Sequence, residues 1–214
     1  MGSILRSRAA AGLAVIVSSI LGLASCASEF TRTGSSPSFL VIESMLGASG
    51  DDPDEFGAPL FADVLDRALQ TVNDQEVCVP LIFNDLGQVR VRGQMRNPTS
   101  PTAPTGINSI TIERYRIVFR RADGRNTPGV DVPHPIDGAA TFTVPADGSA
   151  TFAFDVVRHQ AKLEAPLRAM VGNGGSLFIS TLAEITFYGH DQAGNEVTVA
   201  GTLAVNFGDF GDEC

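Results

Sequence analysis

The chain has little of several residue types, and each shortage narrows the range of functions. It has no tryptophan and two tyrosines in 214 residues. Sugar-binding modules usually stack their ligands on exposed Trp or Tyr, so this depletion argues against sugar stacking as the main activity. It has one lysine, Lys162, and a formal net charge of −9, which argues against nucleic acid as a partner. Neither a Gly-x-Ser-x-Gly nucleophile elbow nor a His-x-x-x-His metal spacing occurs.

Long apolar runs are also scarce, and the one at the N-terminus is informative. Arg6 and Arg8 precede an apolar run from Ala9 to Leu23, and small residues follow. This three-part pattern predicts a secretory signal, and the run is too short for a transmembrane helix. The segment ends in Leu23-Ala24-Ser25-Cys26, which resembles the lipobox of bacterial lipoproteins.

The lipobox resemblance implies that cleavage occurs before Cys26 and that the cysteine is lipidated and anchors the chain in the bacterial envelope. Ala27 follows, where the inner-membrane retention signal of some bacteria has Asp, so the resemblance favours the outer membrane. The alternative is an ordinary signal peptide with an incidental cysteine. We therefore expect a signal peptide at 1–25, a flexible Ser/Thr/Gly-rich tether at 26–37 and one domain at 38–214.

Two cysteines remain if Cys26 carries lipid. Outside the cytoplasm, Cys78 and Cys214 are expected to form one disulfide that ties the C-terminus to the domain. The alternative is two free thiols. A metal site is less favoured, because neither cysteine has a second Cys or a His at ligand spacing.

The domain sequence indicates strands throughout. From residue 76 onward, short β-branched and aromatic runs alternate with Gly, Pro, Asn and Asp. Strands are predicted at 39–42, 76–84, 88–96, 109–121, 139–144, 149–157, 177–190 and 195–207. The spacing of apolar residues predicts short helices over 60–69 and 160–171.

Side-chain alternation and turn residues add detail. Val89 and Val91 alternate with Arg90 and Arg92, which predicts a strand with one buried and one solvated face. In 109–121 the apolar positions change parity near Glu113, which indicates a β-bulge or a change of sheet. Asp-Gly pairs at 123–124 and 147–148 predict tight turns, the second as a hairpin between 142–144 and 150–152.

The last two strands carry a further resemblance. They flank Asp191-Gln192-Ala193-Gly194-Asn195, and this turn resembles the final hairpin of bacterial immunoglobulin-like domains. The resemblance implies an all-β fold, namely an immunoglobulin-like β-sandwich with short helical insertions. It implies little about activity, because this fold hosts many unrelated functions.

Arginines concentrate on two of the predicted strands. If those strands were neighbours, the guanidinium groups would form one stripe able to bind an acidic polysaccharide or an acidic envelope protein. The alternative is pairing with the chain's own carboxylates, such as Glu113. The candidate partner-binding residues are Arg90, Arg92, Arg96, Arg114, Arg116 and Arg120.

Other chemistry-bearing residues have simpler interpretations. His134, His159 and His190 are expected in structural or surface roles, although His190 and Asp191 could act as a base and its orienting group. Capping of the turn by Asp191 is favoured over that alternative. Two acidic clusters could bind calcium, but solvated loops are favoured. These clusters are Asp51, Asp52, Asp54 and Glu55, and Asp209, Asp212 and Glu213.

The sequence therefore predicts a membrane-anchored envelope protein that acts as a non-catalytic binding or structural module. One alternative is an extracytoplasmic hydrolase whose site is assembled from separated residues. A second alternative is a calcium-stabilised adhesion module. Calcium is the one cofactor that the sequence suggests.

Overall fold

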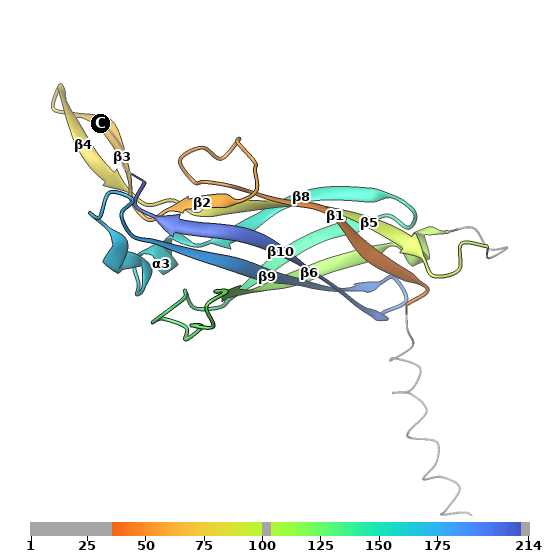
Figure 1. Ribbon diagram of the computed structural model, residues 1–214. Coiled ribbons are helices and arrows are strands. Elements are labelled where there is room, and N and C mark those ends of the chain that lie inside the picture. Colours follow the sequence, from red (N-terminus) through yellow and green to blue (C-terminus); the bar gives the residue numbers. More distant parts are fainter. Residues whose placement is uncertain (1–35, 100–103, 211–214) are drawn as a thin grey trace, which may run out of the picture. The chain divides into compact units, whose positions relative to one another are not determined.

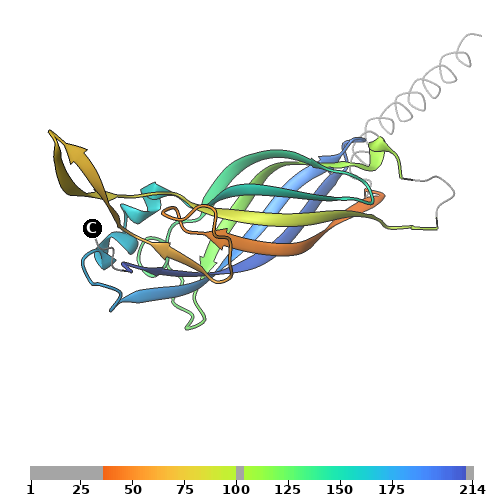
Figure 2. The ribbon, with the colours of Figure 1, turned by 90° about the horizontal axis from the view of Figure 1, so that it is seen from above.

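The computed structural model describes residues 36–99 and 104–210, and this part of the chain is an all-β sandwich (Figures 1 and 2). One sheet has the antiparallel strand order β1-β5-β8, and the other has the order β2-β10-β9-β6-β7. The strands of the first sheet are β1 (Ser38–Ala48), β5 (Asp85–Met95) and β8 (Ser149–Val157). Those of the second are β2 (Leu60–Asp63), β6 (Ile110–Arg120), β7 (Ile136–Val144), β9 (Phe178–Asp191) and β10 (Glu196–Gly208).

The predicted all-β sandwich with short helical insertions is confirmed. The chain passes from β1 in one sheet to β2 in the other, where β2 pairs in parallel with the last strand, β10. The helical pieces are η1 (Gly106–Asn108), α3 (His159–Lys162) and η2 (Leu167–Met170). Within the described residues, no helix has both the length and the apolar content needed to cross a membrane.

The core lies between the two sheets and follows from side-chain alternation. Val89 and Val91 are buried while Arg90 and Arg92 are exposed, as the sequence predicts. Tyr115 of β6 meets Phe154 of β8 edge to face, with ring centroids 5.1 Å apart, and so joins the two sheets. The largest fully buried side chains include Phe119, Phe187, Phe207, Leu60, Ile110 and Ile117.

The predicted β-bulge is confirmed. The pairing of β6 with both β7 and β9 shifts between Ile112 and Arg114. Because one residue is inserted there, Glu113 and Arg114 are both exposed although they are consecutive in the chain.

The helix predicted over 60–69 is wrong. This segment forms β2 and then β3 (Asp66–Val72), which pairs with β4 (Gln75–Leu81). Tertiary pairing overrides the helical spacing, because β2 adds to the edge strand β10 and buries Leu60 and Ala62. The β3–β4 hairpin extends beyond the end of the sandwich at which β10 finishes (Figures 1 and 2).

The helix predicted over 160–171 is confirmed only in two short pieces, α3 and η2. Leu163 ends the first piece, and Pro166 precedes the second. Proline has no N–H to donate and its ring clashes with the preceding turn, so one continuous helix cannot form across it.

The hairpin predicted around Asp147-Gly148 is also wrong. Asp147 does adopt a positive φ of 59°, but the strands on either side belong to different sheets. Strand β7 pairs with β6, and β8 pairs with β5. The turn therefore crosses between the layers of the sandwich. The turn at 123–124 lies in the longer connection from β6 to β7, and Gly124 has a φ of 81°.

Several predictions concern residues outside the described part of the chain. These are the signal peptide at 1–25, the lipidation site Cys26 and the disulfide residue Cys214. Most of the predicted tether also lies outside it, but its last two residues are described. Ser36 is 1% exposed, and its carbonyl oxygen accepts a hydrogen bond from Arg96 Nε at 2.9 Å. Ser36 therefore packs with the domain.

Candidate functional site

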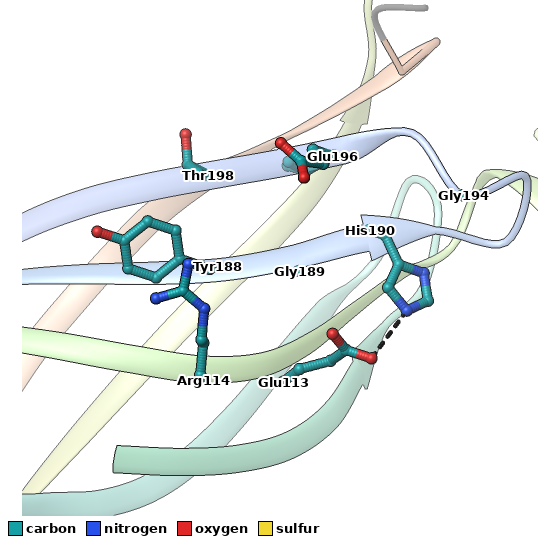
Figure 3. Close-up of a pocket in the computed structure, with 9 residues that line it drawn as sticks. Glu113, Arg114, Tyr188, Gly189, His190, Gly194, Glu196 and Thr198 are labelled. Carbon is teal, nitrogen blue, oxygen red and sulfur yellow. Dashed lines mark hydrogen bonds and ion pairs between the residues drawn. The ribbon is translucent and has the colours of Figure 1, made fainter. Parts of the chain in front are cut away.

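A depression of about 320 Å³ lies on the outer face of the five-stranded sheet, close to the turn between β9 and β10. Its polar lining comes from three adjacent strands (Figure 3). These residues are Glu113 and Arg114 of β6, Tyr188 and His190 of β9, and Glu196 and Thr198 of β10.

Strand register brings these side chains together. Arg114 is paired with Tyr188, and Tyr188 with Thr198, so the three lie in one row across the sheet. His190 is paired with Glu196 in the next row. The bulge adds Glu113 on the same outer face, beside His190 (Figure 3).

The turn that supports this end of the sheet is fixed by Asp191. Its buried carboxylate accepts hydrogen bonds from the backbone N–H groups of Ala193 and Asn195, both at 2.9 Å, and from Asn195 Nδ2 at 2.8 Å. Burial alone would raise the pKa of Asp191, but the hydrogen bonds, chiefly from Asn195, outweigh it and the pKa lies below its usual value. Turn capping by Asp191 is thus confirmed.

Both ring nitrogens of His190 have partners. Nδ1 lies 2.8 Å from the Asp191 carbonyl oxygen, and Nε2 lies 3.0 Å from Glu113 Oε1. The carbonyl contact, followed by that with Glu113, raises the pKa of His190. Only the protonated ring can donate to both acceptors. This arrangement favours an imidazolium cation, and the Asp191 carboxylate is directed at the turn rather than at the ring.

Arg114 differs from the other arginines of its strand. Its guanidinium carbon lies 3.9 Å from the centre of the Tyr188 ring, and among the described residues no carboxylate oxygen lies within 4.0 Å of its nitrogens. On the same face, Arg116 pairs with Asp137 at 2.7 Å and Arg120 pairs with Glu184 at 3.2 Å. Arg114 therefore keeps its edge donors available to a ligand.

The six candidate arginines do not form one stripe. Strand β5 lies in the three-stranded sheet and β6 in the other sheet, so the strands are not neighbours. On β5, Arg90 and Arg92 both pair with Glu43, at 2.8 and 2.7 Å. The guanidinium carbon of Arg96 lies 5.7 Å from the centre of the Phe39 ring. The other four candidates pair with the chain's own carboxylates, and they are Arg90, Arg92, Arg116 and Arg120.

The other candidate residues lie elsewhere. His159 Nδ1 contacts Asn84 Oδ1 at 2.9 Å, and His134 packs against Gly129. Asp51, Asp52, Asp54 and Glu55 are exposed, while Asp209 accepts a hydrogen bond from the Gly172 N–H. Asp212 and Glu213 lie outside the described part of the chain. Within that part, no three His, Cys, Asp or Glu residues are grouped so that they could hold a metal ion.

The sequence pointed to Arg114 and His190, and to Glu113 as a carboxylate partner of the arginines, but Glu113 pairs with His190 instead. It gave no sign that Tyr188, Glu196 and Thr198 lie beside them. The change of parity near Glu113 indicated a bulge, yet the strand order that places β6 beside β9 was not visible. Comparison with known proteins adds no assignment, because no family model and no curated protein matches the chain.

Proposed function

We propose that the domain is a non-catalytic binding module of the bacterial envelope and that the depression on its five-stranded sheet binds a carboxylate of an acidic partner. The observation that carries this proposal is Arg114, which stacks on Tyr188 and has no carboxylate partner among the described residues. The neighbouring arginines of the same strand are paired within the domain.

The chemistry of arginine supports this assignment. Stacking uses the flat face of the guanidinium and leaves its N–H groups, which lie in the plane, free to donate. Two parallel N–H donors match the two oxygens of a carboxylate. His190 lies at the other end of the depression, and Glu113 offsets the charge of its ring when that ring is protonated. Glu196 also lines the depression and repels an anion, so the attraction for a carboxylate comes from Arg114.

The same residues support binding rather than hydrolysis. Nucleophilic catalysis needs a hydroxyl or thiol next to a base that can accept its proton. Thr198 and Tyr188 supply the hydroxyls in the depression, but His190 already uses both ring nitrogens. A hydrolase remains the alternative, and it would need a site other than this depression.

The lipid anchor is the second part of the proposal. Leu23-Ala24-Ser25-Cys26 supports lipidation of Cys26, and two or more acyl chains are what stable membrane attachment requires. The domain would then be held at an envelope membrane, with the outer membrane favoured by Ala27. Its partner would be another component of the same compartment.

Two matched variants test the binding proposal. Chemical crosslinking of intact cells, followed by purification of the lipoprotein, should recover a partner with the wild-type chain and with Arg116→Gln. Arg114→Gln should reduce recovery about tenfold, the expected effect of losing one charge-assisted hydrogen-bonded contact. Equal recovery with Arg114→Gln would contradict the proposal, and so would an equal loss with Arg116→Gln.

A further inference from the structure

The only lysine of the chain is buried against a buried aspartate. Lys162 lies in α3, Asp85 begins β5, and Lys162 Nζ is 2.8 Å from Asp85 Oδ1. The two residues are 2% and 0% exposed. A lysine is among the residues least often fully buried, and this pair lies outside the depression described above.

The hydrogen bonds of Asp85 are incomplete. Oδ1 also accepts the backbone N–H of Gly50 at 3.0 Å. Oδ2 is buried and has no hydrogen-bond partner among the described residues. An unsatisfied buried carboxylate oxygen is costly and calls for an explanation. Burial, which outweighs the attraction of Lys162, raises the pKa of Asp85 to about 6, so the protonated acid is accessible near neutral pH.

We propose that Lys162 and Asp85 become joined by an intramolecular amide bond between Nζ and Cγ. This site would be a self-made covalent modification that ties α3 to the start of β5. The contact geometry and the unpartnered Oδ2 carry the proposal.

The reaction balances without any co-reactant. A proton passes from the Lys162 ammonium to the Asp85 carboxylate, which gives a neutral amine and a neutral acid. The amine nitrogen attacks Cγ and forms the N–C bond, while the Gly50 N–H holds Oδ1, the oxygen that stays. The bond from Cγ to Oδ2 then breaks, and Oδ2 leaves as one water molecule that carries the acid's proton and a second proton given up by the attacking nitrogen. No atom changes its oxidation state.

The fold favours this product for three physical reasons. The two groups are held in contact, and such intramolecular reactions reach very high effective concentrations. The site is buried, so the surrounding water that would drive hydrolysis is excluded. Condensation also removes two buried charges and the unpartnered oxygen, each of which destabilises the ion pair.

The sequence provides a direct readout, because trypsin cleaves after arginine and lysine and the chain has one lysine. The full chain purified from the envelope is denatured, reduced, alkylated, digested and analysed by mass spectrometry. The expected product is a branched peptide that joins residues 68–90 to residues 159–168. Its mass should equal the sum of the two peptides minus one water molecule, with no cleavage after Lys162.

Two variants test the origin of the branch. Lys162→Arg keeps the positive charge but removes the nucleophilic amine, and Asp85→Ala removes the carboxyl group. Both should give residues 68–90 as a linear peptide. Release of residues 159–162 and 163–168 as the main products from the wild-type chain would overturn the proposal and leave the pair as an ion pair only. The wild-type digest distinguishes the amide from the ion pair even if the variants fail to fold.

Discussion

The guanidinium carbon of Arg114 lies 3.9 Å from the centre of the Tyr188 ring, and the two residues are partners on the adjacent strands β6 and β9. Arg116, two positions along the same strand, instead meets Asp137 of β7. One strand face thus carries an arginine that is satisfied within the domain and another that is not. This contrast underlies the proposed binding function and supplies its internal control.

Asp191→Ala should destabilise the domain by about 1–3 kcal/mol, because it removes the charged acceptor of the Ala193 and Asn195 N–H groups in a partly buried turn. Asp191→Asn, which keeps one oxygen of similar position, should cost less. Urea unfolding of the variants measures the difference. Equal stability of wild type and Asp191→Ala would show that the turn does not depend on this cap.

The lowered pKa of Asp191 predicts how the stability of the domain depends on pH. Because the folded pKa of Asp191 lies below its usual value, its contribution to stability is present above the unfolded pKa and is lost as the pH falls through the folded pKa. Unfolding curves between neutral and acid pH should show a smaller loss for Asp191→Asn than for wild type. Parallel curves would contradict this assignment.

The pKa of His190 should be raised in the folded protein, and Glu113→Gln should lower it, because the variant removes the negative charge that favours the protonated ring. The Asp191 carbonyl remains, so the pKa should not fall below its ordinary value. The stabilising effect of the protonated ring is present below the unfolded pKa and is lost as the pH rises through the folded pKa. NMR titration of His190 checks the shift. An unchanged pKa in Glu113→Gln would exclude the contact.

Local patterns in the sequence predicted most of the strands and the bulge. The alternation of Val89, Arg90 and Val91 indicates which face of the strand is buried. It can be seen in the sequence because successive side chains of a strand point to opposite faces. The parity change at Glu113 is local as well. The Asp191 turn was also predictable, because a capping side chain acts within a few residues.

Pairing between distant strands was not predictable from these patterns. The apolar spacing over 60–69 suits a helix, yet the start of this segment forms β2, which pairs with the free edge of β10. The turn at Asp147 resembles a hairpin, but its strands join different sheets. The candidate site needed the same missing information, because Arg114 and Tyr188 are 74 positions apart in the sequence and meet only through strand order.

Cys78 and Cys214 should form the disulfide expected from the sequence. In the loop-entropy model, a bridge that closes about 136 residues stabilises the fold by about 4–5 kcal/mol at most. Cys78→Ser and Cys214→Ser should therefore be destabilised equally, since both remove the same link. Thiol labelling of the denatured, unreduced wild-type chain gives the direct measurement. Full labelling of both cysteines would rule the bridge out.

Cys26→Ala should remove the lipid anchor, so the variant should be released from membranes or accumulate as the uncleaved precursor. Cell fractionation, with the size of the chain followed on gels, distinguishes these two outcomes from a mature chain that stays with the membranes. A Cys26→Ala chain of mature size that still fractionates with membranes would show that the lipobox assignment is wrong.

The most direct measurement of the binding proposal is site-specific photo-crosslinking in intact cells from position 198, where Thr198 lines the depression. Position 202 is the control, since Thr202 is exposed on the same strand outside the depression. We expect a crosslinked partner from position 198 that disappears when Arg114→Gln is added and persists with Arg116→Gln. No adduct from position 198, or one that does not depend on Arg114, would contradict it.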